Sequence, residues 1–198
     1  MGDLGVGDWQ DDRETQIVEF IRTHPTTLGL LESPNFTEMQ SSLDITETLR
    51  EKSLITGALA SPQKMVMAPF FFKNRREKSI VMFAYLGDRV CGHPGIVHGG
   101  LLATLLDEGL ARCCFPELPN KVGVTANLNI DYRAPAVADT YIVLKARTTA
   151  IQGRKAWVEG SIETLPVAEE KPTVLVEATA LFIEPKSAAA MESPYKET

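Results

Sequence analysis

Residues that can polarise a carbonyl group and residues that can hold a proton lie close together in the middle of the chain. His93 and His98 are two of the three histidines in the sequence, and Gly99 and Gly100 follow His98 directly. Glycines at the start of a helix leave backbone N–H groups uncovered at the positive end of the helix dipole. Such N–H groups bind a carbonyl or phosphate oxygen. Asp107 follows inside an apolar stretch, where a carboxylate is costly unless it is paired or faces a site.

The stretch at 101–111 is apolar and rich in good helix formers, which predicts a buried helix of about three turns. Helical winding places Asp107 on one face with small side chains, away from most leucines. That small-residue face consists of Ala103, Thr104, Ala111 and Cys114. Gly99 and Asp107 are roughly 12 Å apart along one helix axis, so a single reacting carbon cannot touch both. If both act in one site, a second copy of the helix must supply one of them, which predicts a homodimer with its sites at the interface.

The composition is that of an ordinary folded protein and excludes several classes. The net charge of −6 argues against a nucleic-acid partner. No apolar run approaches the ~18 residues that span a membrane. The acidic N-terminus resembles neither a secretory signal nor an Arg-rich transit peptide. With three cysteines, Cys113 and Cys114 adjacent, neither a disulfide framework nor a metal motif is indicated. We therefore expect a cytoplasmic protein with no metal site and no integral membrane segment.

The order of predicted elements indicates an α+β fold. Period-two patterns and turn residues predict strands at 65–73, 79–86, 122–132, 140–150, 155–164 and 173–183. A single apolar helix among about six strands is best buried by wrapping the antiparallel sheet around it. Two such sheets could pair edge to edge, which would also protect an exposed edge strand.

Three segments are expected along the chain. Residues 1–62 form an N-terminal extension, with an amphipathic helix at 14–22 that stops near Pro25 and a less regular helix at 44–59. Residues 63–186 form the main domain, and 187–198 form a flexible tail. Within the strand at 122–132, regular alternation sets one group of side chains against the other: Thr125, Asn127, Asn129 and Asp131 against Val124, Ala126, Leu128 and Ile130.

The run from His98 to Asp107 resembles the hotdog-fold acyl-CoA thioesterases, in which His-Gly-Gly is followed by an aspartate at this distance. The later run Val124 to Tyr132 and Gly153-Arg154-Lys155 resemble the branch that contains thioesterase superfamily members 4 and 5, which is related to the phenylacetate-degradation thioesterases. The resemblance covers roughly residues 64–185. It implies a hotdog fold, an antiparallel sheet around one long central helix, and hydrolysis of an acyl-CoA to free acid and CoA, with CoA as part of the substrate and no separate cofactor.

The resemblance also implies residue roles. Asp107 is the catalytic carboxylate, as general base or nucleophile, and the Gly99 N–H polarises the thioester carbonyl. His98 shapes the loop and can hydrogen-bond near that carbonyl, and Thr125 positions the water or the carboxylate. Some relatives carry an asparagine shortly before His-Gly-Gly, where this chain has Cys91-Gly92-His93. His93 itself is interpreted as structural because it precedes a proline.

The remaining expectations concern substrate binding and the alternatives. Residues expected to contact the substrate or CoA are Gly100, Asn127, Arg133, Arg154 and Lys155. The assembly is expected to be a homodimer or a dimer of dimers. A non-catalytic acyl-CoA or acyl-chain binding module and a hotdog hydratase or dehydratase stay open as alternatives. A serine hydrolase is disfavoured because no Gly-x-Ser-x-Gly elbow occurs.

Overall fold

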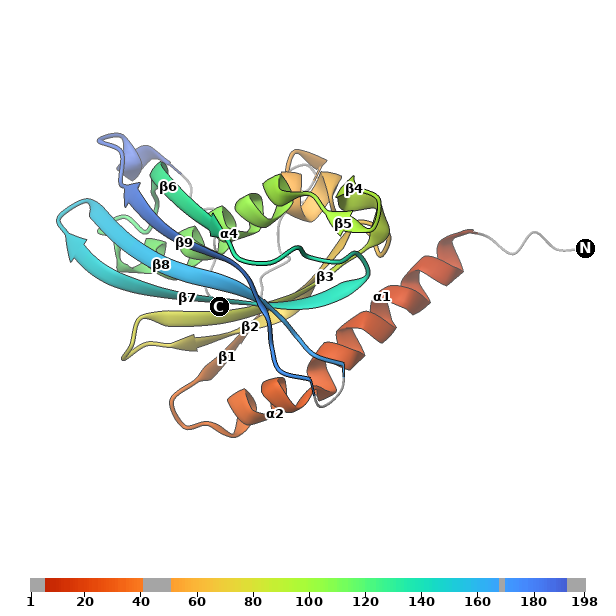
Figure 1. Cartoon of the computed structure of the whole chain (residues 1–198). Coiled ribbons are helices and arrows are strands. Elements are labelled where there is room, and N and C mark those ends of the chain that lie inside the picture. The colour runs from red at the N-terminus through yellow and green to blue at the C-terminus, as the bar shows by residue number, and fades with distance from the viewer. Residues whose placement is uncertain (1–5, 41–50, 168–169, 192–198) are drawn as a thin grey trace, which may run out of the picture.

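A computed structural model of the chain describes residues 6–40, 51–167 and 170–191. Its main sheet has seven strands in the order β1-β2-β3-β7-β8-β9-β6, and all neighbours are antiparallel. The strands are β1 (Thr37–Gln40), β2 (Met65–Asn74), β3 (Ser79–Leu86), β6 (Val124–Tyr132), β7 (Thr140–Gln152), β8 (Lys155–Thr164) and β9 (Val174–Ile183). The helix α4 (Gly99–Cys114) lies in the concave side of this sheet (Figure 1). The predicted architecture, an antiparallel sheet around one long helix, is confirmed.

The inner core fills the space between α4 and the sheet. Leu102, Leu105, Leu106 and Leu110 of α4 are each at most 2% exposed. They belong to one apolar cluster with residues from β2, β3, β7, β8 and β9. Because the leucine stripe is buried, the opposite stripe of α4, which carries Asp107, is left half-buried. The helix is therefore anchored by one face and presents the other.

A second core lies on the outer face of the sheet, where α1 (Val6–Thr23) crosses β2 and β3 (Figure 1). Ile17 and Ile21 of α1 are buried against Phe70, Phe72 and Phe83. β2 and β3 are buried on both faces, which explains their continuous apolar runs. The predicted first helix is present and longer than expected, and it ends before Pro25.

Short elements that the sequence pattern did not predict complete the fold. These are α2 (Pro25–Glu32), β1, the π-helical turn η1 (Leu54–Ala58), and the small hairpin of β4 (Cys91–His93) and β5 (Ile96–Val97). Part of the helix expected at 44–59 lies outside the described residues, and its described end forms η1. The tail expected at 187–198 is described only as far as residue 191.

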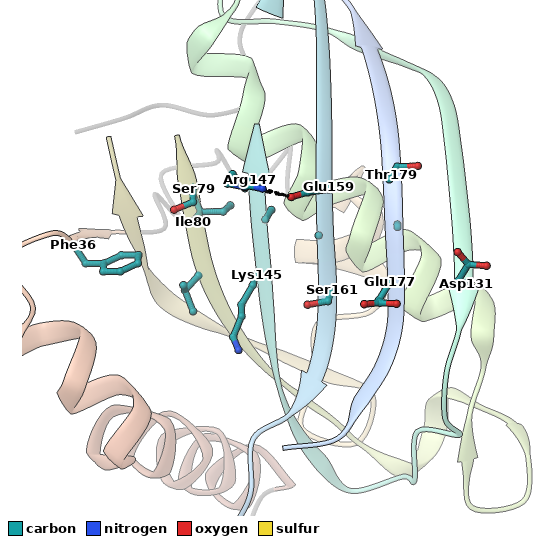
Figure 2. Close-up of a pocket in the computed structure, with 14 residues that line it drawn as sticks. Phe36, Ser79, Ile80, Asp131, Lys145, Arg147, Glu159, Ser161, Glu177 and Thr179 are labelled. Carbon is teal, nitrogen blue, oxygen red and sulfur yellow. Dashed lines mark hydrogen bonds and ion pairs between the residues drawn. The ribbon is translucent and has the colours of Figure 1, made fainter. Parts of the chain in front are cut away.

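Near its start, β7 meets α1, where Tyr141 packs on Phe20. The outer face of β8, of β9 and of the part of β7 that carries Lys145 and Arg147 is polar. Figure 2 shows Lys145, Arg147 and Glu159 projecting from this face, with α4 behind the sheet. The charged side chains pair across strands, with 2.6 Å between Arg147 and Glu159 and 2.7 Å between Lys145 and Glu163. Such cross-strand pairs are typical of a solvated sheet face.

Candidate active site

His98 forms the N-cap of α4 through its ring. The Gly100 N–H donates to His98 Nδ1 at 2.9 Å, so the neutral ring carries its proton on Nε2. The backbone of His98 is held as well, because its N–H donates to the Val90 carbonyl at 2.8 Å. His98 thus fixes the entry of the helix and turns an Nε2–H donor outward.

The two glycines after His98 have close neighbours. A side chain at Gly100 would place its Cβ 2.9 Å from His98 Nδ1, closer than real Cβ atoms approach. A Cβ at Gly99 would lie 3.3 Å from the ring of Tyr132. His-Gly-Gly is therefore a packing unit as well as a source of exposed N–H groups.

Tyr132, at the end of β6, closes the first turn of α4 from the other side. Its hydroxyl donates to the Gly99 carbonyl oxygen at 2.8 Å. Tyr132 is the last residue of the motif at 124–132, but the sequence predicted no role for it. The contact joins the last residue of β6 to the first residue of α4.

Asp107 is paired with Thr125, the residue that by the family resemblance was expected to position the water or the carboxylate. The Thr125 hydroxyl donates to Asp107 Oδ1 at 2.7 Å. Among the described residues no other hydrogen bond to Asp107 is present, so Oδ2 stays available to a water molecule or a substrate atom. A hydrogen bond to a charged carboxylate holds it strongly in one orientation.

A β-bulge in β6 makes this pairing possible. The register with β9 shifts between Thr125, opposite Phe182, and Asn127, opposite Leu181, so Ala126 is an extra residue. As a result Thr125 lies on the same face as Leu128 and Ile130, which pack on the inner core. The regular alternation expected along this strand, with Thr125 opposed to Leu128 and Ile130, is wrong at the bulge.

A pocket of about 490 Å³ opens at the start of α4. His98, Gly99 and Leu102 line it from the helix, and Tyr132 and Arg133 line it from β6 and the segment after it. His93, which was expected to be structural, also lines the pocket. The pocket wall therefore combines free helix N-terminal groups with an arginine.

The other predicted binding residues lie at separate places. Arg154 is in the β7–β8 turn, where its Nη1 donates to the Glu184 carbonyl at 2.6 Å. Lys155 begins β8 and is two strands away from Val124, at the end of the sheet where β6 begins. Asn127 lies on the outer face and accepts a hydrogen bond from Asn129 at 2.6 Å, so within one chain it does not face Asp107. The binding roles of these residues stay predictions.

A larger hollow of about 650 Å³ lies on the outer face of the sheet, with Phe36, Lys145, Arg147, Glu159 and Glu177 in its wall (Figure 2). Two of its charged side chains, Arg147 and Glu159, pair with each other at 2.6 Å. Within the described parts of the chain, no cluster of three or more histidines, cysteines or acidic residues could hold a metal ion. In the same parts, every helix is too short or too polar to cross a membrane.

The comparisons with known proteins agree with this geometry. The family model of the thioesterase superfamily matches residues 94–170, which include the helix start, Asp107 and Thr125. An uncharacterized mitochondrial protein of Candida albicans is 34% identical over 171 residues, which is 86% of this chain and 77% of that protein. The rat acyl-coenzyme A thioesterase THEM4 is 40% identical over 112 residues, 57% of this chain and 46% of THEM4.

Among solved structures, the PaaI protein of the Escherichia coli phenylacetic acid degradation operon has a TM-score of 0.51 at 15% identity. The match covers 69% of this chain and 87% of that protein, and it supports the fold alone. The chain spans less than half the length of THEM4 but most of the Candida protein. Taken with the sheet wrapped on α4, the His-Gly-Gly turn and the Asp107–Thr125 pair, these matches show that the chain belongs to the thioesterase superfamily and has the hotdog fold.

Proposed function

We propose that the chain is an acyl-CoA thioesterase that works as a homodimer, with each active site shared by the two subunits. The observation that carries the proposal is the layout of β6. Thr125, at one end of this strand, holds Asp107, and Tyr132, at the other end, contacts Gly99. The carboxylate and the helix N-terminus thus lie near opposite ends of one strand, and along the axis of α4 they are roughly 12 Å apart.

β6 is an open edge of the sheet. Among the described strands it pairs with β9 alone, and most of its side chains are exposed. An antiparallel copy of β6, related by a two-fold axis near Leu128, would place the partner subunit's Thr125 opposite Ile130 once the bulge at Ala126 is counted, on the face that carries Tyr132. Each Asp107 would then meet the Gly99 of the other subunit, and the dimer would hold two equal sites.

The α4 helix accommodates the same axis. The midpoint between Gly99 and Asp107 is Ala103, which is half-buried and lies on the same stripe of α4 as Asp107. Of the predicted small-residue face, Ala103 and Thr104 are half-buried, whereas Ala111 and Cys114 are buried in the inner core. Small side chains at that point allow two α4 helices to cross closely. The symmetry inferred from β6 and the symmetry inferred from α4 therefore agree.

The proposed chemistry uses groups whose positions are described. The Gly99 N–H and the helix dipole stabilise negative charge on the thioester oxygen. Asp107 either takes a proton from an attacking water or attacks the carbonyl carbon itself, with Thr125 holding its Oδ1. In the first route, cleavage of the C–S bond releases the acid, and the CoA thiolate takes the proton that Asp107 had accepted from water. In the second route, cleavage of the C–S bond releases CoA and leaves the acyl group on Asp107 as an anhydride, which a water molecule then hydrolyses to the acid. The Nε2–H of His98 is available to the carbonyl oxygen or to a bound water.

Binding of CoA is proposed to involve basic residues from both subunits. Arg133 borders the pocket at the Gly99 end of β6, whereas Arg154 and Lys155 lie at the end of the sheet where β6 begins. The proposed axis brings Arg154 and Lys155 of one subunit toward Arg133 of the other. Guanidinium and ammonium groups at such a junction suit the phosphates of CoA. The name of the rat relative supports CoA as the carrier.

The location of the protein is also a proposal. The acidic N-terminus predicted the cytoplasm, whereas the printed name of the Candida relative favours the mitochondrion. We propose a mitochondrial location. Fractionation of cells that express the full-length protein at its native level tests it, and co-fractionation with cytosolic markers alone would reject it.

The test of function is release of free thiol from a panel of acyl-CoA substrates, from short to long aliphatic chains and aryl acids. We expect turnover by the wild-type chain and a fall of about 10³-fold in kcat for Asp107→Asn, which keeps the shape of the side chain. Glu159→Gln, on the outer face, is the matched control and should keep full activity. Binding without turnover on the whole panel would favour the non-catalytic binding module, and hydration of an enoyl-CoA would favour the hydratase.

A further inference from the structure

We infer that Tyr132 is a positioning residue of the reaction, whose hydroxyl holds the first peptide of α4 so that the Gly99 N–H stays free for the oxyanion. The inference rests on the proposed thioesterase function and adds to it a residue that the sequence motifs did not assign. Tyr132 acts through Gly99 and does not itself touch the reacting atoms.

The peptide between Gly99 and Gly100 is fixed through both its carbonyl oxygen and its N–H. Its carbonyl oxygen accepts from the Tyr132 hydroxyl at 2.8 Å, and its N–H donates to His98 Nδ1 at 2.9 Å. One residue further on, the Thr104 hydroxyl donates to the Gly100 carbonyl at 2.8 Å. Glycine is the most mobile of residues, so two in succession at a catalytic turn need such external contacts.

Of the first three N–H groups of α4, the Gly99 N–H is the one that stays available to a ligand. The Gly100 N–H is taken by His98 Nδ1, and the Leu101 N–H donates to the His98 carbonyl at 2.9 Å. In the described residues no acceptor is recorded for the Gly99 N–H. We call the contacts of Tyr132 and His98 with this turn the clamp. The neighbouring donors are therefore used within the turn, and the Gly99 N–H, at the positive end of the helix dipole, is left for a ligand.

The Tyr132 ring lies against the start of α4 although it is not buried in the core. Tyr132 is 53% exposed, so burial in the core does not hold it in place. Its ring nevertheless lies against Gly99, 3.3 Å from the point where a Cβ would be, and its hydroxyl reaches the carbonyl of the same residue. The ring covers one side of the helix start and keeps water from that side, which strengthens the remaining N–H as an oxyanion donor.

A group that orients an oxyanion donor affects the transition state more than the bound substrate. Removal of the Tyr132 hydroxyl should therefore lower kcat and leave KM nearly unchanged. If Tyr132 instead contacted the substrate directly, its loss would raise KM. If its role were only to stabilise the fold, the loss would lower the melting temperature and change neither kinetic constant.

The experiment compares Tyr132→Phe, which keeps the ring, with Tyr141→Phe, which removes a hydroxyl from a ring packed on Phe20 and Tyr85 at the outer face. With the best acyl-CoA of the panel, Tyr132→Phe should lose about tenfold in kcat with KM within about twofold, and Tyr141→Phe should match the wild type. Wild-type kcat in Tyr132→Phe, or a raised KM at constant kcat, would overturn the inference.

Hydrogen exchange gives a readout that does not depend on turnover. Amide exchange at 99–104 should be faster in Tyr132→Phe than in the wild type, and unchanged there in Tyr141→Phe, because only the first variant releases the clamp. Equal exchange in all three proteins would overturn the inference. A wild-type chain that hydrolyses no thioester while Tyr132→Phe still accelerates exchange would reject the proposed function and leave the clamp standing.

Discussion

The two edges of the main sheet differ in almost every respect. The β1 edge is short, at four residues, and Arg22 of α1 reaches Glu38 of this strand at 2.8 Å. The β6 edge has nine residues, mostly exposed, and carries both contacts that order the candidate site. Short edge strands resist pairing with other chains, whereas long exposed ones invite it. The difference indicates that one edge completes the fold and the other completes the site.

The largest effect should come from charging the β6 edge. With the axis near Leu128, Asn127 of one subunit neighbours Asn129 of the other, so the double change Asn127→Lys and Asn129→Lys sets four ammonium groups together. We expect a monomer in sedimentation and a fall in kcat of about 10³-fold, because each site loses its second half.

The matched control charges the other edge, through Thr37→Lys and Gln40→Lys, both at exposed positions of β1. This variant should remain a dimer with full activity. Added salt screens the new repulsion and should partly restore the dimer of the β6 variant. An active monomeric β6 variant would remove the distinction between the edges.

A smaller effect is expected from the Gly99 N–H. Gly99 is the first helical residue, a position that favours proline, and His98 has φ −62° and ψ 127°, which suits a residue before proline. Gly99→Pro therefore removes the N–H while keeping the helix start. We expect kcat to fall about 10²-fold, as for lost oxyanion donors elsewhere.

Gly99→Ala is the control, since it adds the same Cβ beside Tyr132 but keeps the N–H. It should lose much less activity than Gly99→Pro when both are assayed on the same acyl-CoA. Equal losses would assign the effect to crowding of the Tyr132 ring and not to the missing donor.

Thr125→Val should lower kcat less than the charged β6 edge or Gly99→Pro does, because it removes only the hydroxyl that holds Asp107 Oδ1. A lost hydrogen bond to a carboxylate predicts about a tenfold lower kcat. Thr125→Ser keeps the hydroxyl and should retain most of the activity. Wild-type kcat in Thr125→Val would show that Asp107 needs no orientation from β6.

The smallest effect on activity is expected from a change at Tyr85 of β3, on the outer face of the sheet where α1 packs. The Tyr85 hydroxyl donates to Asp139 at 2.6 Å and accepts from Arg13 at 2.9 Å. Burial, aided by the bond to Asp139, raises the pKa of Tyr85 to about 12. Folding thus favours the neutral phenol, and the stability it contributes is complete below the unfolded pKa of about 10 and is lost as pH rises toward 12.

Tyr85→Phe removes that titration. Urea unfolding between pH 9 and pH 11.5, roughly the window set by these pKa values, should show a shallower loss of stability in the variant than in the wild type. Activity at neutral pH should not change. Parallel stability curves would mean that the buried phenol does not titrate with folding.

The sequence predicted the parts of the site that depend on local chemistry. Residue type and spacing indicated His98, Gly99 and Asp107 as candidate site residues. The apolar runs of β2 and β3 predicted those strands. Tyr132 was not predicted because Thr125 and Tyr132 are an odd number of residues apart, which in a regular strand puts them on opposite faces. Only the bulge at Ala126 brings both to the inner face, and no residue type marks that bulge.

The outer core was also missed, for a different reason. Phe70 and Phe72 alternate with Phe71, which predicts burial on both faces but does not say what covers the outer one. The cover comes from Ile17 and Ile21, far away in sequence. Long-range partners of this kind are set by packing, which residue patterns do not specify.

The claim that the site is shared across the two-fold is tested most directly by mixing two inactive variants. Asp107→Asn and Gly99→Pro, refolded together, form mixed dimers in which one site has an intact Gly99 from one chain and an intact Asp107 from the other. With random pairing, we expect activity to return to about a quarter of the wild-type value. Mixed dimers confirmed by native mass spectrometry, with no activity above that of the parents, would contradict it.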